Sequence, residues 1–367
     1  MKRVLCLFLA ALLAATCAGC GWMDGAYVSV KPHQVGYSQS TGDITIVDSP
    51  AGLRKAVTAM IDSGNTEAVM TLMGYSEAEA RSDIEKIIIY CTQNYPTGAY
   101  AVEQIHYEIG QGLLLLQIDY RRSKAQIDRI QSVRGLSGAQ EAIGSALVNC
   151  VDSLTLQVTL YTEMDVVQYI ADYAAENPDM VMELPQVTVQ TYPQTGTTRI
   201  LELEFSYQNS REKLREMLRQ VKQVFSAARL YVTTDADDSV KLNQLYGFLM
   251  ERFDYTVQTS MTPAYSLLNY GVGDSRAFAQ VYAAMCRQSG LEAMTVSGTC
   301  NGESRFWNIV RDGEVYYHVD LLECARLGSL LKRTDGEMTG YVWDYSAYPV
   351  CGGETQLPRT ENNDPEN

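Results

Sequence analysis

The sequence is short of positive charge. It carries 29 lysines and arginines against 44 aspartates and glutamates, which gives a formal net charge of −15 at pH 7. Such a surface repels phosphates and anionic lipid headgroups, and no basic patch interleaved with aromatic residues interrupts it. We therefore expect no nucleic-acid partner and no electrostatic attraction to anionic lipids.

The sequence also lacks the cysteine and histidine spacings of zinc sites. Six cysteines follow Cys20, and none of them forms a CxxC pair or a cluster with histidine. They are Cys91, Cys150, Cys286, Cys300, Cys324 and Cys351. We expect no metal and no cofactor. Export would permit disulfides, but a chain of this size does not need them. Their pairing stays open, beside the alternative that all six are buried free thiols.

Apolar runs long enough to cross a bilayer are missing. Lys2 and Arg3 precede an apolar run over residues 4–15. This run falls well short of the roughly 20 residues that a spanning helix needs. A basic start, a short apolar run and small residues before a cysteine are typical of a cleaved export signal. The sequence therefore predicts a signal peptide over residues 1–19.

The end of this signal, Ala18-Gly-Cys20, resembles a bacterial lipobox, although Cys17 stands where leucine is usual. The resemblance implies that Cys20 becomes the lipidated first residue of the mature protein, with Cys17 as the fallback. Two or three acyl chains would hold the protein on the outer face of the cytoplasmic membrane. The alternative is an ordinary secretory signal with incidental cysteines. Cleavage would remove two cations and no acids, so the mature chain would carry −17.

The first two thirds of the chain contain an internal repeat. Residues 113–127 align with residues 200–214 at an offset of 87, so that Tyr120 meets Tyr207. In each copy an alternating strand runs through a turn into a second strand, which indicates a hairpin. A serine three residues after the tyrosine is a natural N-cap for the helix that follows. With a further strand and helix upstream, the predicted unit is β-α-β-β-α.

This repeat predicts two tandem α+β modules, at residues 43–135 and 153–228. The strand and helix within residues 44–61 are matched with those within residues 154–174. The small-residue stretch 135–146 is interpreted as the connection between the modules. The modules carry no chemistry that the sequence identifies, which favours a spacer or a binding surface.

The C-terminal third carries several motifs in a fixed order. A glycine-containing turn and an amphipathic helix lead to Val296-Ser-Gly298, then to Arg305-Phe-Trp-Asn308 and to Tyr317-His-Val-Asp320. This order resembles the transglutaminase-like superfamily, in which a turn places a nucleophilic cysteine at the start of a helix. A His-Ala-Trp-Asn strand then supplies the base, and a Tyr-x-x-Asp strand supplies the orienting aspartate. The resemblance covers residues 238–352 and implies an α+β domain of the papain-like cysteine-protease type.

Two of the three catalytic positions depart from the family. Ser275 stands at the cysteine position, three residues before Phe278. Arg305 stands at the histidine position, two residues before Trp307, and only Asp320 is retained. The family's chemistry needs a nucleophile, an imidazole that takes and returns its proton, and a carboxylate that orients the imidazole. A guanidinium stays protonated and cannot take a proton. The resemblance therefore implies a pseudoenzyme.

His318 is the candidate substitute base, since it lies two residues from Asp320 and on the same face of the predicted strand. Family members, however, often carry a histidine there beside their catalytic one. Cys286 falls on the helix after Ser275, where the family has apolar core. We expect instead that Arg305 pairs with Asp320, because a buried carboxylate without a partner is costly. The alternative is that both are ordinary surface residues.

The sequence predicts a lipid-anchored extracytoplasmic protein whose non-catalytic transglutaminase-like domain binds a peptide, cell-wall or protein partner. A competing hypothesis is an acyl-transfer or peptidase-type hydrolase that uses Ser275, with Asp320 and His318 in support. A third is a structural spacer without a ligand. The acidic tail at residues 353–367 shows no apolar periodicity and is predicted to be disordered. Ligand identity and oligomeric state are not fixed by the sequence.

Overall fold

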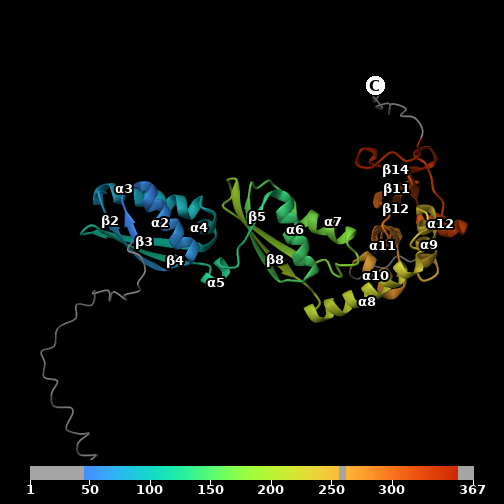
Figure 1. Ribbon diagram of the computed structural model, residues 1–367, viewed down its shortest axis with the longest axis horizontal. Coiled ribbons are helices and arrows are strands. Elements are labelled where there is room, and N and C mark those ends of the chain that lie inside the picture. Colours follow the sequence, from blue (N-terminus) through green and yellow to red (C-terminus); the bar gives the residue numbers. More distant parts are fainter. Residues whose placement is uncertain (1–44, 256–261, 354–367) are drawn as a thin grey trace, which may run out of the picture. The chain divides into compact units, whose positions relative to one another are not determined.

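The computed structural model describes residues 45–255 and 262–353 (Figure 1). The predicted signal peptide, the lipidation candidate Cys20 and residues 354–367 of the predicted disordered tail lie outside the described residues. Within the described ranges, no helix combines the length and the apolar character that a membrane crossing requires.

The first part of the described chain is a four-stranded sheet with the order β1-β2-β4-β3. Its strands are β1 (Thr45–Val47), β2 (Glu67–Leu72), β3 (Val102–Gly110) and β4 (Leu113–Tyr120). β1 runs parallel to β2, and the other pairs are antiparallel. Its helices are α2 (Pro50–Ser63), α3 (Glu77–Gln93), α4 (Pro96–Ala101) and α5 (Lys124–Ile127). The apolar stripes of α2 and α3 share one core with the sheet.

A second four-stranded sheet has the order β5-β6-β8-β7. Its strands are β5 (Gln131–Arg134), β6 (Ser153–Thr159), β7 (Gln186–Tyr192) and β8 (Thr198–Ser206). Again the first pair is parallel and the others are antiparallel. Helices α6 (Gly135–Val148) and α7 (Val166–Glu176) pack on it. The two sheets therefore share strand order and strand directions, and the two hairpins predicted from the aligned segments are present.

The predicted β-α-β-β-α unit, however, has the wrong order of helices and strands. Each sheet is built as β-α-β-α-β-β, with the short helix α4 added before β3 in the first. β1 and α2 therefore correspond in position to β5 and α6, and not to the segment 154–174. The stretch 135–146 is no linker, because it forms most of α6. Its glycines, alanines and serines imitate a loop in composition. Ile143 and Leu147 nevertheless lie one turn apart and are buried against the sheet, and this burial stabilises the helix.

Helix α8 (Arg211–Tyr231) also differs from the prediction, which placed residues up to 228 in the second module. Ser210 caps the helix by accepting a hydrogen bond from the backbone of Lys213 at 3.3 Å. The buried side chains of α8 belong to the core of the C-terminal region. They are Leu214, Met217, Val221, Phe225 and Ala228. The C-terminal core thus begins before residue 238, because the apolar stripe of α8 is covered by that region.

The C-terminal region places helices on an antiparallel sheet with the order β13-β12-β11-β14. Its helices are α9 (Asp238–Met250), α10 (Pro263–Tyr270), α11 (Ser275–Gln288) and α12 (Leu321–Leu327). The sheet strands are β11 (Ala293–Cys300), β12 (Glu303–Asp312), β13 (Val315–Val319) and β14 (Tyr341–Trp343). A short parallel pair joins β9 (Asp254–Tyr255) to β10 (Val272–Gly273). The chain is of the α+β class, as predicted.

Both faces of this last sheet are covered. Val310 and Val319 pack with the helices, whereas Val296, Trp307 and Ile309 pack in a separate cluster with residues of the closing segment 338–351. Alternation of side chains along β12 sends Trp307 and Ile309 to one face and Val310 to the other. The sheet therefore holds α11 on one side and the closing segment on the other.

Candidate functional site

The three positions that the sequence aligned with the family's catalytic residues lie at the ends of neighbouring elements. Ser275 is the first residue of α11, Arg305 lies near the start of β12, and Asp320 follows β13 as the N-cap of α12. Asp274 caps α11 by accepting a hydrogen bond from the Ala277 backbone at 2.9 Å. Asn308 of β12 donates from Nδ2 to the Ala279 carbonyl of α11 at 2.8 Å. These contacts fix the start of α11 against β12.

Ser275 is half-buried beside β12. Its hydroxyl oxygen accepts a hydrogen bond from the backbone N–H of Phe306 at 3.3 Å. Among the described residues, no imidazole or carboxylate accepts a hydrogen bond from this hydroxyl. Ser275, which the sequence aligned with the family's nucleophile, is thus a hydroxyl without a base hydrogen-bonded to it among the described residues.

Arg305 and Asp320 form a two-point ion pair. Nε of Arg305 donates to Oδ2 of Asp320 at 2.8 Å, and Nη2 donates to Oδ1 at 2.9 Å. The Asp320 side chain is only 2% exposed and that of Arg305 is 21% exposed. Burial lowers the pKa of the guanidinium, but the hydrogen bonds and charge of Asp320 outweigh it and raise the pKa overall. The ion pair predicted from the sequence is confirmed.

The Asp320 carboxylate has further partners. The Tyr341 hydroxyl donates to Oδ2 at 2.7 Å, and the backbone N–H groups of Leu322 and Glu323 donate to Oδ1 at 3.0 Å and 3.3 Å. Burial, followed by the hydrogen bond to Asp320, raises the pKa of Tyr341 and keeps it a donor. Sequence reasoning missed Tyr341, although it lies on a short strand with a buried aromatic residue two positions on. The carboxylate is thus hydrogen-bonded on both oxygens, and none of its partners is an imidazole.

His318, the candidate substitute base, is fully buried and both its ring nitrogens are occupied. Trp307 Nε1 donates to Nδ1 at 3.0 Å, and Nε2 lies 2.9 Å from Oδ1 of Asp335. An indole nitrogen can only donate, so we assign the proton of the neutral imidazole to Nε2, which donates to Asp335. Burial lowers the pKa of His318 despite the opposing effect of Asp335. No ring nitrogen is left to take a proton from Ser275.

His318, Asp335 and Cys351 are the one group in the described chain with metal-ligand chemistry, since one donor atom of each lies within 4.8 Å of the others. A metal on Nε2 would need the lone pair of that nitrogen. The hydrogen bond from Trp307 to Nδ1 instead leaves a proton on Nε2. Burial, followed by the charge of Asp335, raises the pKa of Cys351 to about 12, which favours the thiol over the metal-binding thiolate. These side chains fit a hydrogen-bonded cluster better than a metal site.

The cysteines behave as packing residues. All six of the described region are free thiols, and Cys91, Cys286, Cys324 and Cys351 are buried. Cys286 lies in the core of α11, and burial raises its pKa. A protonated thiol without solvent access is a poor nucleophile. Cys286 therefore belongs to the core, as the sequence favoured.

A model of the transglutaminase-like superfamily matches residues 226–321, a range that contains Ser275, Arg305 and Asp320. The match begins within α8, in agreement with the place of that helix in the C-terminal core. The chain therefore contains a transglutaminase-like domain. No curated protein matches the chain.

Solved structures with a detectable likeness include a TGase, at 10% identity and a TM-score of 0.26, over 46% of this chain and 50% of that one. A proposed cysteine protease from Cytophaga hutchinsonii is 12% identical, with a TM-score of 0.26, over 46% of this chain and 70% of that one. A proposed protease from Parabacteroides distasonis is 7% identical, with a TM-score of 0.23, over 45% of this chain and 39% of that one. The match spans only half of the TGase chain.

Proposed function

We propose that the transglutaminase-like domain of this chain is non-catalytic and binds a peptide, cell-wall or protein partner. We further propose that an N-terminal lipid holds the protein on the outer face of the cytoplasmic membrane. The two-point ion pair between Arg305 and Asp320 carries the first proposal. It takes up the carboxylate that would otherwise orient a catalytic base.

The chemistry of acyl transfer supports this proposal step by step. A serine hydroxyl attacks a carbonyl only when a base removes its proton. Arg305 occupies the position of that base, and a guanidinium keeps its proton at any accessible pH. His318 is held by Trp307 and Asp335. The contacts of Arg305 and His318 therefore support a Ser275 hydroxyl that is not activated.

The surface beside Ser275 supports a binding role. Arg276 is exposed, and its guanidinium carbon lies 4.7 Å from the centre of the Phe306 ring. Arg276 forms no ion pair with another residue of the described region, in a chain where acids outnumber bases. A guanidinium stacked on an aromatic ring is weakly hydrated and presents donors to a carboxylate. Peptides and peptide-bearing cell-wall polymers offer such carboxylates.

The catalytic question has a direct experiment. Wild type and Ser275→Ala are incubated with a serine-directed fluorophosphonate probe, and covalent labelling is followed by intact mass. We expect no labelling of either protein. Labelling of the wild type that Ser275→Ala removes would instead establish the hydrolase hypothesis, with Ser275 as its nucleophile.

Binding is tested by co-sedimentation of the protein with purified, insoluble peptidoglycan. The wild type is compared with Arg276→Glu, and Arg326→Glu on the exposed side of α12 is the matched control. We expect the Arg276 variant alone to lose sedimentation. If the wild type stays in the supernatant, the cell-wall form of the proposal is wrong. If both variants sediment to the same extent, binding does not depend specifically on Arg276.

The anchor is tested in cells of the source organism by fractionation. Cys20→Ala should release the protein from the membrane fraction, whereas Cys17→Ala should leave it there. The N-terminal peptide of the wild type should carry the added mass of its acyl chains. Release by Cys17→Ala alone would move the anchor to Cys17. An unmodified N-terminus in the wild type would favour the ordinary secretory signal.

A further inference from the structure

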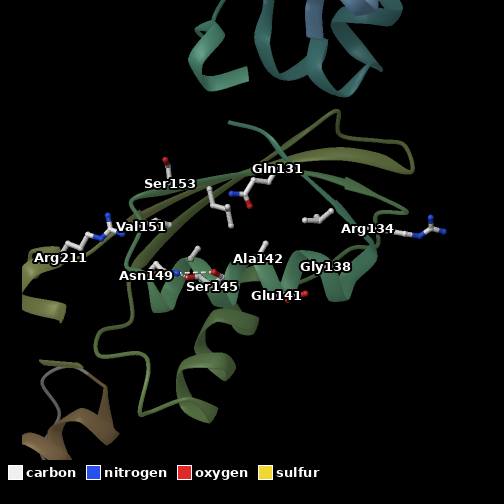
Figure 2. A pocket seen from close by; sticks show the side chains of 13 residues that line it. Gln131, Arg134, Gly138, Glu141, Ala142, Ser145, Asn149, Val151, Ser153 and Arg211 are labelled. Carbon is white, nitrogen blue, oxygen red and sulfur yellow. Dashed lines mark hydrogen bonds between the residues drawn. The ribbon is translucent and has the colours of Figure 1, made fainter. Parts of the chain in front are cut away.

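The second sheet module contains a groove of about 800 Å³ (Figure 2). Helix α6 forms one wall with Gly138, Ala142 and Ala146, and strands β5 and β6 contribute Val133 and Leu154. Apart from Glu141, the α6 residues that line the groove have small side chains, so α6 and the strands do not close the space between them. The groove lies in a different region of the chain from Ser275 and Arg305.

The first module shows why this space is open. The buried residues of α2 are Leu53, Val57, Met60 and Ile61. At the same spacing, α6 has Ala139, Ile143, Ala146 and Leu147. Two positions that carry large side chains in α2 therefore carry alanine in α6. Met60 and Ala146 are both buried in the cores of their modules, but Ala146 also borders the groove. The smaller side chain of Ala146 leaves space that the longer Met60 fills in the first module.

The groove has positive charge at both ends. Figure 2 shows Arg134 at one end and Arg211 at the other. Neither arginine forms an ion pair with another described residue, although the chain has 44 acids. Glu141 is the single acid among the lining residues. Within a Debye length of about 10 Å, such arginines act on a ligand more strongly than distant surface acids do.

The edge of the sheet indicates the shape of the ligand. β5 stands at the end of the strand order and pairs only with β6 among the described strands. The free edge of such a strand offers backbone donors and acceptors to an extended chain. Gln131 of β5 and Ser153 of β6 add polar side chains to the lining. An extended peptide can use the edge, the apolar floor and both arginines together.

We propose that this groove binds an extended peptide that carries two carboxylates, one paired with Arg134 and the other with Arg211. Small or apolar residues between the carboxylates would lie over Val133 and Ala146. This site is independent of the proposed role of the transglutaminase-like domain. It would give the second module a recognition function in place of that of a spacer.

The test uses the full mature chain and a series of end-blocked peptides in which two glutamates are separated by two to six alanines. Binding is measured by isothermal titration calorimetry at low salt. We expect at least one spacing to bind saturably, and its glutamine-ended counterpart to bind at least about tenfold more weakly, because charge-assisted hydrogen bonds are lost. Added salt should weaken the glutamate peptide alone.

Three variants locate the binding. Arg134→Ala and Arg211→Ala should each weaken it at least about tenfold. Arg215→Ala is the matched control, since Arg215 is exposed one turn further along α8 and does not line the groove. It should change binding less than about twofold, the effect of an exposed charge.

Filling the groove gives a second measurement. Ala146→Met copies the residue that fills the equivalent position of the first module, and it should abolish binding while the circular dichroism spectrum stays native. If this variant does not fold, the exposed double change Arg134→Glu with Arg211→Glu takes its place. The proposal is wrong if no peptide binds saturably, or if Arg215→Ala weakens binding as much as the groove variants do. Arg134 lies outside the matched residues 226–321, so a loss of peptide binding in Arg134→Ala separates this site from the transglutaminase-like domain.

Discussion

The Arg305 guanidinium faces the Asp320 carboxylate edge to edge, with Nε 2.8 Å from Oδ2 and Nη2 2.9 Å from Oδ1. This parallel arrangement is the strongest that the two groups can form. It joins β12 to the start of α12 and fixes these two elements against each other.

Removal of Arg305 should therefore be costly. Arg305→Met would leave the nearly buried Asp320 charge with only Tyr341 and two backbone N–H groups as donors. We expect the free energy of unfolding to fall by about 3–5 kcal/mol, as when a buried pair loses one partner. Urea denaturation followed by tryptophan fluorescence measures this change.

Two controls separate the pair from its surroundings. Arg311 pairs with Glu314 at the surface, so Arg311→Met should cost less than about 1 kcal/mol. The double change Arg305→Met with Asp320→Asn should be less destabilised than Arg305→Met alone, because the unpaired charge is gone. A double variant that is as unstable as the sum of its single variants would show that the pair contributes no coupling.

His318 should make stability depend on pH. Burial lowers its pKa in the folded state below the usual 6.5, so the unfolded chain binds the proton first as the pH falls. The stabilisation is fully present above about pH 6.5 and is lost progressively as the pH falls below that value. The free energy of unfolding, measured from pH 7.5 to 5, should therefore fall less steeply in His318→Gln than in the wild type.

Asp335→Asn provides the opposite test of this linkage. The Asp335 carboxylate favours the charged imidazole, so its removal should lower the pKa of His318 further. We expect a larger loss of stability between pH 6.5 and 5 than in the wild type. Identical slopes for the wild type, His318→Gln and Asp335→Asn would show that other groups set the pH dependence.

The thiols should differ in reactivity according to burial. Cys150 and Cys300 are half-buried, whereas Cys286 is fully enclosed in the core around α11. We expect iodoacetamide to modify Cys150 and Cys300 in the native protein and Cys286 only after unfolding. Peptide mass spectrometry with and without urea measures the order. Fast native modification of Cys286 would revive it as a displaced nucleophile.

Gly298 should tolerate no side chain. A Cβ placed on it would lie 2.7 Å from Cη2 of Trp307 and closer still to the Val342 carbonyl oxygen of β14. Gly298→Ala would therefore force both β14 and the Trp307 ring away from residue 298. We expect the free energy of unfolding to fall by about 3 kcal/mol, the upper end of the range for overpacking. Gly247→Ala is the control, since its Cβ would meet nothing within 4 Å inside α9. It should stabilise the protein by about 0.5–1 kcal/mol.

Local patterns predicted the hairpins and the Arg305–Asp320 pair correctly. Alternation along β3, β4, β7 and β8 depends only on neighbouring residues and which face is buried. The ion pair was predicted from the positions of Arg305 and Asp320 in the family's motifs and from the cost of an unpaired buried carboxylate. The antiparallel pairing of β12 with β13 brings the two residues together. The sequence predicted a linker where α6 forms, because the small residues of this segment have the composition of a loop. The burial of Ile143 and Leu147 against the sheet, which stabilises the helix, is visible only in the structure. The sequence placed α8 in the wrong module, because an apolar stripe shows that a helix is buried on one face but not which core covers that face.

The sequence by itself determined the α+β class and the transglutaminase-like domain, and it predicted the ion pair between Arg305 and Asp320. These are properties of residue type, order and spacing. Only the tertiary structure decided that Tyr341 completes the partners of Asp320, that Trp307 and Asp335 hold His318, and that α6 leaves a groove beside β5. Such contacts join residues of separate elements, and their geometry exists only once burial has set the distances between those elements.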